Sequence, residues 1–376
     1  MKKMKKYFLY FLALFAILSA CKQMDSTYKE FVIPNGLNYP QKADSLKIYP
    51  GYYRLLLQWE KPKAPNVKYS MVYWNNYTDS LKVNFPSDSD TVSLLIKDLS
   101  ESSYSFNIKN FDAQGNVSIP VEATSTPYGA NYLIGATDRS YTIATRDEAN
   151  TGTITWGTKT SDLMYTEVKY MTTSDTYRTI KALPTESITI CDDIKAGERF
   201  QYRSFFLPKN GLDTIAREWQ TSEKPFMYNY PRNDWFVSAR NGNHAWGDGG
   251  GGQPALLLDG KTNTGWHSNA SAPLPQCVVV DLKESLIIDH IILTPPSTVG
   301  WRYIRDVDIY FSDTPITPDV PQESWGPPVV RSTYLSGDTF KVQLPEPKSG
   351  QYVALVFPNS KSNTYISFME LNIFGY

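Results

Sequence analysis

The chain has 376 residues, with 37 Lys and Arg against 38 Asp and Glu, so its formal net charge is −1. Such a balance gives no positive field for a phosphate backbone, which excludes nucleic acid as an expected partner. Hydrophobic residues make up 41% and charged residues 20%, which excludes a disordered chain, and three His and three Cys are too few for a zinc cluster or a disulfide scaffold.

The first 20 residues have the pattern of a signal peptide. Lysines at positions 2, 3, 5 and 6 precede the apolar run from Tyr7 to Leu18, which is too short to span a bilayer. The sequence LSAC that ends at Cys21 resembles a bacterial lipobox, which implies cleavage before Cys21 and lipidation of that residue. Since Lys22 rather than Asp follows, the lipoprotein pattern implies the outer membrane. We expect exposure at the cell surface, although the sequence leaves the membrane face open.

Residues 21–127 and 128–225 are two copies of one unit. Past residue 21, short alternating apolar runs are separated by Gly, Pro, Asn and Asp, which is the pattern of an all-β protein. Trp59 is matched by Trp156 after 97 residues. Three more pairs recur at offsets of 95 or 96, namely Leu99 with Ile194, Tyr104 with Phe200 and Gly115 with Gly211. Each copy has the size of an immunoglobulin-like sandwich with a buried Trp.

Both copies resemble fibronectin type III repeats, in which a corner tyrosine forms a hydrogen bond that Phe200, lacking a hydroxyl, cannot make. The tandem also resembles an uncharacterised domain family of bacterial surface lipoproteins. We interpret the copies as spacers, followed by a linker at 226–231 that nearby prolines make stiff. Cys191 and Cys277 lie in different domains within apolar strand patterns, so we expect buried free thiols.

Residues 232–376 carry the most specific resemblance. Residues 255–268 read ALLLDGKTNTGWHS, and apolar strands follow at 277–282, 287–293, 307–312, 352–357 and 367–375. This arrangement resembles a coagulation factor 5/8 type C (discoidin) domain, whose bacterial members include family 32 carbohydrate-binding modules. The resemblance implies an eight-stranded jelly-roll sandwich. The expected fold class is therefore all-β, with two tandem immunoglobulin- or fibronectin-like sandwiches followed by a discoidin-type jelly roll.

Two acids in this unit predict a cation site. Asp259-Gly260 is by itself a turn signal, but Glu370 is a lone acid in an apolar strand and needs a counter-charge. Calcium takes carboxylate, hydroxyl and carbonyl oxygens. The resemblance implies carboxylates from Asp259 and Glu370, hydroxyl and carbonyl from Thr264, and carbonyls from Leu256, Lys261 and Met369. We expect a structural Ca²⁺ that ties the ends of the domain together, and Trp266 in the core.

Three loops hold residue types that bind sugars, namely rings for stacking and polar side chains for hydroxyl groups. The candidate ligand-binding residues are His244, Trp246, His267, Trp301, Arg302, Tyr303 and Asn363. Each aromatic ring has the alternative role of closing one end of the sandwich. The glycine run at 247–252 is no phosphate-binding loop, because no Gly-Lys-Ser/Thr follows it.

The sequence contains no nucleophile elbow, metalloprotease helix or dinucleotide-binding glycine motif, and spacers plus one binding module account for the mature chain. We therefore expect no enzymatic activity. The leading hypothesis is a lipid-anchored outer-membrane protein whose C-terminal domain captures carbohydrate for a polysaccharide uptake system, with an outer-membrane transporter complex as its partner. The alternatives are a non-catalytic adhesion or scaffold protein that docks a protein without binding sugar, and an accessory to an enzyme.

Overall fold

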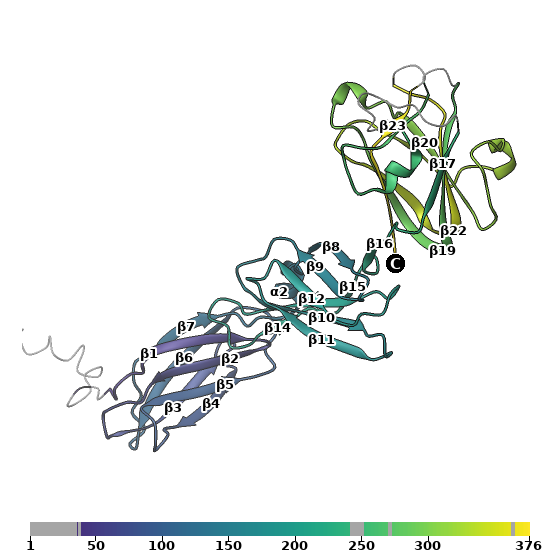
Figure 1. Ribbon diagram of the computed structural model, residues 1–376. Helices are drawn as coiled ribbons and strands as arrows, with labels where there is room; N and C mark the ends of the chain where they lie inside the picture. Colours follow the sequence, from purple (N-terminus) through teal and green to yellow (C-terminus); the bar gives the residue numbers. More distant parts are fainter. Residues whose placement is uncertain (1–35, 37–38, 241–251, 270–272, 362–364) are drawn as a thin grey trace, which may run out of the picture. The chain divides into compact units, whose positions relative to one another are not determined.

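The computed structural model describes residues 36, 39–240, 252–269, 273–361 and 365–376, with Trp301 described by its backbone alone. The chain divides into two compact units, Met1–Ala136 with Leu207–Ile215, and Thr137–Phe206 with Ala216–Tyr376. Strands dominate both units (Figure 1), which confirms the predicted all-β class. Among the described residues, no helix has the length and hydrophobicity needed to cross a membrane.

The first unit contains a sandwich of two antiparallel sheets. The three-stranded sheet has the order β1 (Asp44–Gly51), β2 (Arg54–Glu60) and β5 (Thr91–Ile96). The four-stranded sheet has the order β4 (Asp79–Asn84), β3 (Val67–Trp74), β6 (Tyr104–Asp112) and β7 (Val121–Ser125), and the short helix α2 (Ala130–Gly135) follows. Trp59 is fully buried in the core of this sandwich, as the sequence predicts.

The second sandwich opens the second unit. One sheet contains β8 (Tyr141–Arg146), β9 (Gly152–Trp156) and β12 (Ile188–Cys191). The other contains β10 (Leu163–Met171), β11 (Tyr177–Ala182), β13 (Gln201–Phe206), β14 (Ile215–Ala216) and β15 (Gln220–Thr221). Trp156 and the free thiol of Cys191 are buried, which confirms both predictions. The corner differs between copies: the Tyr104 hydroxyl lies 2.9 Å from that of Ser100, whereas Phe200 packs in the core.

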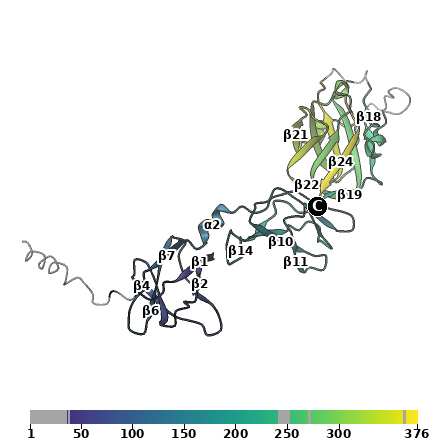
Figure 2. The ribbon, with the colours of Figure 1, turned by 90° about the vertical axis from the view of Figure 1, so that its left-hand side faces the viewer.

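The C-terminal domain is a jelly-roll β-sandwich (Figure 2). Its elements are β17 (Phe236–Ala239), η1 (Pro254–Leu258), β18 (Trp266–His267), β19 (Gln276–Thr294), η2 (Val299–Trp301), β20 (Asp306–Ser312), η3 (Gln322–Trp325), β21 (Val330–Thr333), β22 (Phe340–Phe357), β23 (Ser367–Phe368) and β24 (Glu370–Gly375). The long strands β19 and β22 pair with each other and contribute alternate side chains to the core. Trp266 is fully buried there, and Cys277 is a buried free thiol, as predicted.

The segment 226–231, expected as a linker, contributes the strand β16 (Met227–Asn229). β16 pairs in parallel with β8 and antiparallel with β24, so one sheet runs from the second sandwich into the C-terminal domain. Just before it, the Lys224 ammonium donates to both carboxylate oxygens of the buried Asp289 at 2.9 Å. The connection is therefore part of the hydrogen-bonded sheet of the second unit.

Candidate functional site

The turn after η1 positions the first of the two predicted acids. Gly260 adopts φ +77°, a backbone conformation that glycine takes readily, and lets the chain fold back over Asp259. The Asp259 carboxylate accepts a hydrogen bond from the Lys261 amide at 2.9 Å and one from the Thr264 hydroxyl at 2.6 Å. The turn therefore holds Asp259 and Thr264 together, as expected for a shared oxygen site.

A close backbone contact fixes this turn to the last strand. A Cβ atom at Gly265 would lie 2.5 Å from the Cα atom of Met369 and 2.5 Å from the carbonyl oxygen of Phe368, so only glycine fits there. β18, which starts at the next residue, pairs with β23, which ends just before Met369. The contact brings the loop that carries Leu256, Asp259, Lys261 and Thr264 against Met369 and Glu370.

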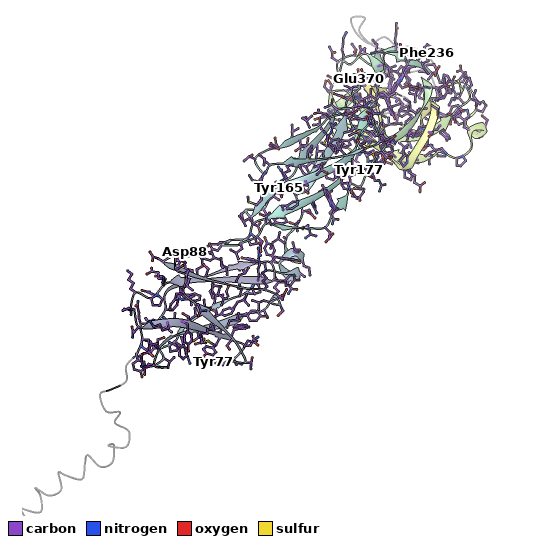
Figure 3. All side chains as sticks on the ribbon, turned by 90° about the horizontal axis from the view of Figure 1, so that it is seen from below. Tyr77, Asp88, Tyr165, Tyr177, Phe236 and Glu370 are labelled. Atoms are coloured by element: carbon purple, nitrogen blue, oxygen red, sulfur yellow. The ribbon has the colours of Figure 1, made fainter. Side chains whose placement is uncertain are left out.

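Glu370, labelled in Figure 3, is buried and has an ion-pair partner that the sequence analysis missed. The Arg232 guanidinium contacts its Oε2 atom through Nη1, which also donates to the Leu371 carbonyl at 2.8 Å. The Oε1 atom has no hydrogen-bond partner among the described residues. Arg232 thus satisfies one side of the carboxylate and leaves the other oxygen unsatisfied, which is costly for a buried polar atom.

The carboxyl groups of Asp259 and Glu370 influence each other's pKa. Burial raises the pKa of Glu370, Arg232 opposes this shift, and the neighbouring Asp259 raises the pKa further. For Asp259, burial alone would raise the pKa, but the hydrogen bonds from Thr264 and the Lys261 amide outweigh burial and lower it. Two neighbouring acids are stabilised by a positive charge close to both, which a cation would supply.

These residues fit a hard cation. The donor set consists of oxygens only, and the Oε1 atom of Glu370 is buried without a hydrogen-bond partner among the described residues. Within the described ranges, no three or more His, Cys, Asp or Glu side chains gather into a possible metal cluster. Two carboxylates would therefore need the Thr264 hydroxyl and backbone carbonyls to complete the coordination, which is the set that the sequence resemblance implies.

A cavity of about 200 Å³ lies beside this loop in the C-terminal domain. It is lined by Thr262, Asn263, His267, Pro296, Ser297, Thr298, Tyr303, Ser367 and Met369. Two of the predicted ligand-binding residues, His267 and Tyr303, thus share one cavity. Because Thr262, Asn263 and Met369 also flank the acid pair, the cavity wall and the acid pair belong to the same loop and strand.

An aromatic cluster surrounds His267. Its ring centroid lies 6.2 Å from that of Tyr303, edge to face, and 5.0 Å from that of Tyr365, while the two tyrosine rings are 5.6 Å apart. The Nδ1 atom of His267 lies 2.7 Å from the carbonyl oxygen of Ser268, so Nδ1 carries a proton and donates it to this carbonyl. Tyr365 was missed in the choice of candidates, although it closes the polar loop that holds Asn363.

Arg302 has a different role from the one expected. Its guanidinium donates to the carbonyls of Pro296, Gly337 and Ser297 at 2.7, 2.6 and 3.3 Å and to the Asp338 carboxylate at 2.8 Å. These hydrogen bonds tie two loops together and use four of the N–H donors of the guanidinium. The expectation that Arg302 donates these hydrogen bonds to a ligand is therefore corrected.

The remaining predicted ligand-binding residues and the predicted lipidation residue lie outside the described part of the chain. Cys21, His244, Trp246 and Asn363 are outside the described residues, and so is the side chain of Trp301. Their expected roles remain predictions.

The class of protein follows from the fold: a multidomain all-β chain that ends in a jelly-roll sandwich with a cavity at its loops. Residues 21–215 match the model of DUF4998, described as a domain of unknown function, and since this match covers more than half of the chain, the chain belongs to that family. Residues 238–371 match the F5/8 type C domain model, which identifies the C-terminal domain. No curated protein matches the chain.

Several solved structures are similar to part of this chain. One is a family 32 carbohydrate-binding module of Clostridium perfringens NanJ in complex with galactose, with 19% identity over 40% of this chain and 100% of that chain and a TM-score of 0.33. A second Clostridium perfringens module, in complex with GalNAc-β-1,3-galactose, has 21% identity over 39% and 99% and a TM-score of 0.34. The C-terminal domain of a Bacteroides fragilis chitobiase has 22% identity over 39% and 95% and a TM-score of 0.33. At these scores the domain is identified by its family model alone.

Proposed function

We propose that this chain is a non-catalytic, lipid-anchored outer-membrane protein whose F5/8 type C domain captures carbohydrate for a polysaccharide uptake system. The observation that carries the proposal is the cavity beside the acid pair, where His267 and Tyr303 stand together. The flat tyrosine face suits the C–H face of a sugar, and the imidazole, Thr262, Asn263 and Ser297 suit its hydroxyl groups. Among the described residues that line the cavity there is no Lys, Arg, Asp or Glu, which favours a neutral saccharide.

Calcium is part of the proposal as a structural ion. Asp259, Glu370 and Thr264 would hold it, with carbonyls of Leu256, Lys261, Thr264 and Met369 completing its shell. The bound ion would supply the positive charge that the acid pair lacks and would fix the loop that forms one wall of the cavity. Its removal would then weaken sugar binding through the loop, without any contact between ion and sugar.

The membrane location rests on the sequence alone. The lipobox that ends at Cys21 supports a lipid anchor, and Lys22 supports delivery to the outer membrane. The two sandwiches, read as fibronectin-like spacers, would hold the binding domain away from the anchor. Labelling the expressing cells with palmitate, beside a Cys21→Ser variant that should remain unlabelled, tests the anchor separately from sugar binding.

A glycan array of plant, host and microbial saccharides, probed with the full mature chain in calcium and in chelator, tests the binding function. We expect at least one saccharide class to bind, and His267→Ala and Tyr303→Ala each to weaken binding about tenfold, the loss of one or two good contacts. Phe236→Ala is the matched control, because Phe236 is 61% exposed in the same domain and does not line the cavity. A blank array under both conditions would contradict the proposal, as would equal losses in all three variants.

A further inference from the structure

The first unit holds a second cavity, of about 510 Å³, on the sheet formed by β4, β3, β6 and β7. Its lining includes four aromatic side chains, Tyr73, Trp74, Tyr77 and Tyr104, and a row of polar ones that includes Asn107 and Glu122. All of them belong to the described residues, and neither the family models nor the proposed function gives them a role.

Strand register explains why distant residues meet in this cavity. Tyr73 of β3 pairs with Asn107 of β6, and Asn107 pairs with Glu122 of β7. Residues paired across neighbouring strands project from the same face, so the three side chains form one row across the sheet. Ser105, two residues from Asn107 on the same face, donates its hydroxyl hydrogen bond to the Glu122 carboxylate and so positions it.

The turn that joins β3 to β4 closes one side of the row. Asn75, Asn76 and Tyr77 have φ values of 47°, 54° and 65°, in the left-handed region that asparagine tolerates and a bulky aromatic residue rarely adopts. This conformation places the Tyr77 ring beside Tyr73, with centroids 5.1 Å apart and planes at 42°. The Lys109 ammonium lies 4.9 Å from the Tyr77 centroid and 5.6 Å from that of Tyr73. The turn thus holds a half-exposed tyrosine at the rim of a polar row.

The second copy of the sandwich shows that the fold does not require this row. Both copies keep the buried Trp and a stacked Tyr–Phe pair on the outer face, Tyr69 with Phe111 and Tyr165 with Phe205. Four residues further along the strand, however, the second copy has Lys169 in place of Tyr73. Lys169 pairs with Gln201 and Gln201 with Thr221, where the first copy has Asn107 and Glu122. The row is therefore a property of the first copy and not of the shared architecture.

We propose that this cavity is a second, independent binding site for a neutral saccharide. Tyr77 and Tyr73 offer ring faces for the C–H face of a sugar. For the sugar hydroxyls, the Asn107 amide offers an NH2 donor and an oxygen acceptor, and the Glu122 carboxylate offers further acceptor oxygens. An anionic ligand would meet the Glu122 carboxylate and a cationic one the Lys109 ammonium, so the site disfavours net charge. The site requires neither calcium nor the C-terminal cavity.

Affinity electrophoresis of the full mature chain through gels that contain galactomannan, xyloglucan, yeast mannan, arabinogalactan or laminarin tests the site. Tyr77→Ala removes the rim ring, and we expect about a tenfold weaker retention by at least one of these polysaccharides. Tyr177→Ala is the matched control: Figure 3 labels both tyrosines, Tyr177 is 62% exposed against 50% for Tyr77, and its ring also faces a lysine, Lys169, at 4.6 Å. It lies outside the cavity, so retention should stay unchanged.

Glu122→Gln keeps the size and shape of an exposed side chain and should change the stability by less than about 0.5 kcal/mol, so it keeps the proposal testable if Tyr77→Ala folds poorly. We expect it to weaken the same interaction. The effects of both variants should persist in a His267→Ala/Tyr303→Ala background, which separates this site from the C-terminal one.

If the His267→Ala/Tyr303→Ala background alone removes all retention and Tyr77→Ala changes nothing, the second site is refuted and the proposed function stands. Equal losses from Tyr77→Ala and Tyr177→Ala also refute it. Retention that depends on Tyr77 but not on His267 or Tyr303 supports the second site and contradicts the C-terminal one.

Discussion

Arg232 and a bound cation would balance the same buried carboxylate, so the removal of the arginine should make the C-terminal domain depend on calcium. In Arg232→Met, Glu370, whose side chain is 5% exposed, loses its ion pair. Removing one partner of a buried pair costs about 3 kcal/mol or more. At about 2–4 °C per kcal/mol for a unit of this size, the unfolding transition should fall by about 6–12 °C in chelator. Calcium at about a hundred times its dissociation constant would restore about 2.7 kcal/mol, which is most of the loss.

The pH dependence of this variant follows from the raised pKa of Glu370. Burial keeps that pKa above its ordinary value of 4.5, and the loss of Arg232 removes the main opposing influence. Protonation of Glu370 therefore supports the fold below pH 4.5, and this support disappears as the pH rises through the folded-state pKa. In chelator, Arg232→Met should recover part of the lost stability near pH 5 relative to pH 8.

Differential scanning calorimetry of the full mature chain in calcium and in chelator measures these shifts. Arg232→Met/Glu370→Gln is the control, because without the arginine the neutral amide leaves no buried charge at this pair: we expect it to unfold at a higher temperature in chelator than Arg232→Met and to show no calcium response. If Arg232→Met unfolds at the same reduced temperature with and without calcium, no cation binds between the acids. If it unfolds like the wild type in chelator, Arg232 is not the counter-charge, and the reasoning fails.

Three further predictions concern packing, the bridging strand and the thiols. Gly265→Ala would place its Cβ 2.5 Å from the Met369 Cα, so calorimetry should show lower stability and a weaker calcium response. Gly135→Ala is the control: its Cβ would have no atom within 4 Å, so the stability should change by less than about 0.5 kcal/mol. Lys224→Met should cost about 2 kcal/mol in urea unfolding at neutral pH. Burial alone would raise the pKa of Asp289, but hydrogen bonds from His290, Lys224 and Gln343 lower it. The stability that the Lys224–Asp289 pair contributes is therefore present above pH 3.8 and fades as the pH falls below that value. If Lys224→Met lost the same stability at pH 7 and at pH 2.5, the pairing would be contradicted. Burial raises the pKa values of Cys191 and Cys277 to about 12, so a thiol reagent should label neither in the native protein and both in denaturant.

The sequence predicts those features that depend on local patterns. Alternating apolar runs gave the strand class, the repeated Trp gave two cores, and the turn at Asp259-Gly260 was readable from two residues. Arg232 was not predictable in this way, because 138 residues separate it from Glu370 and only the folded sheet brings them together. The row of Tyr73, Asn107 and Glu122 was missed for the same reason, since it exists only once the register of three strands is known.

The bridging strand β16 explains why the second sandwich and the C-terminal domain form one compact unit. β24 ends the C-terminal domain, and without β16 its outer edge would present unpaired backbone groups, which natural sheets avoid. β16 pairs with the last two residues of that edge, Phe374 and Gly375, and at the same time pairs with β8 of the second sandwich. Both sets of pairs come from three consecutive residues, so Met227–Asn229 alone join the two edges. The connection from Lys224 to Tyr230 is therefore stiff because of its pairing, and the prolines beside it only contribute to an order that the sheet already imposes.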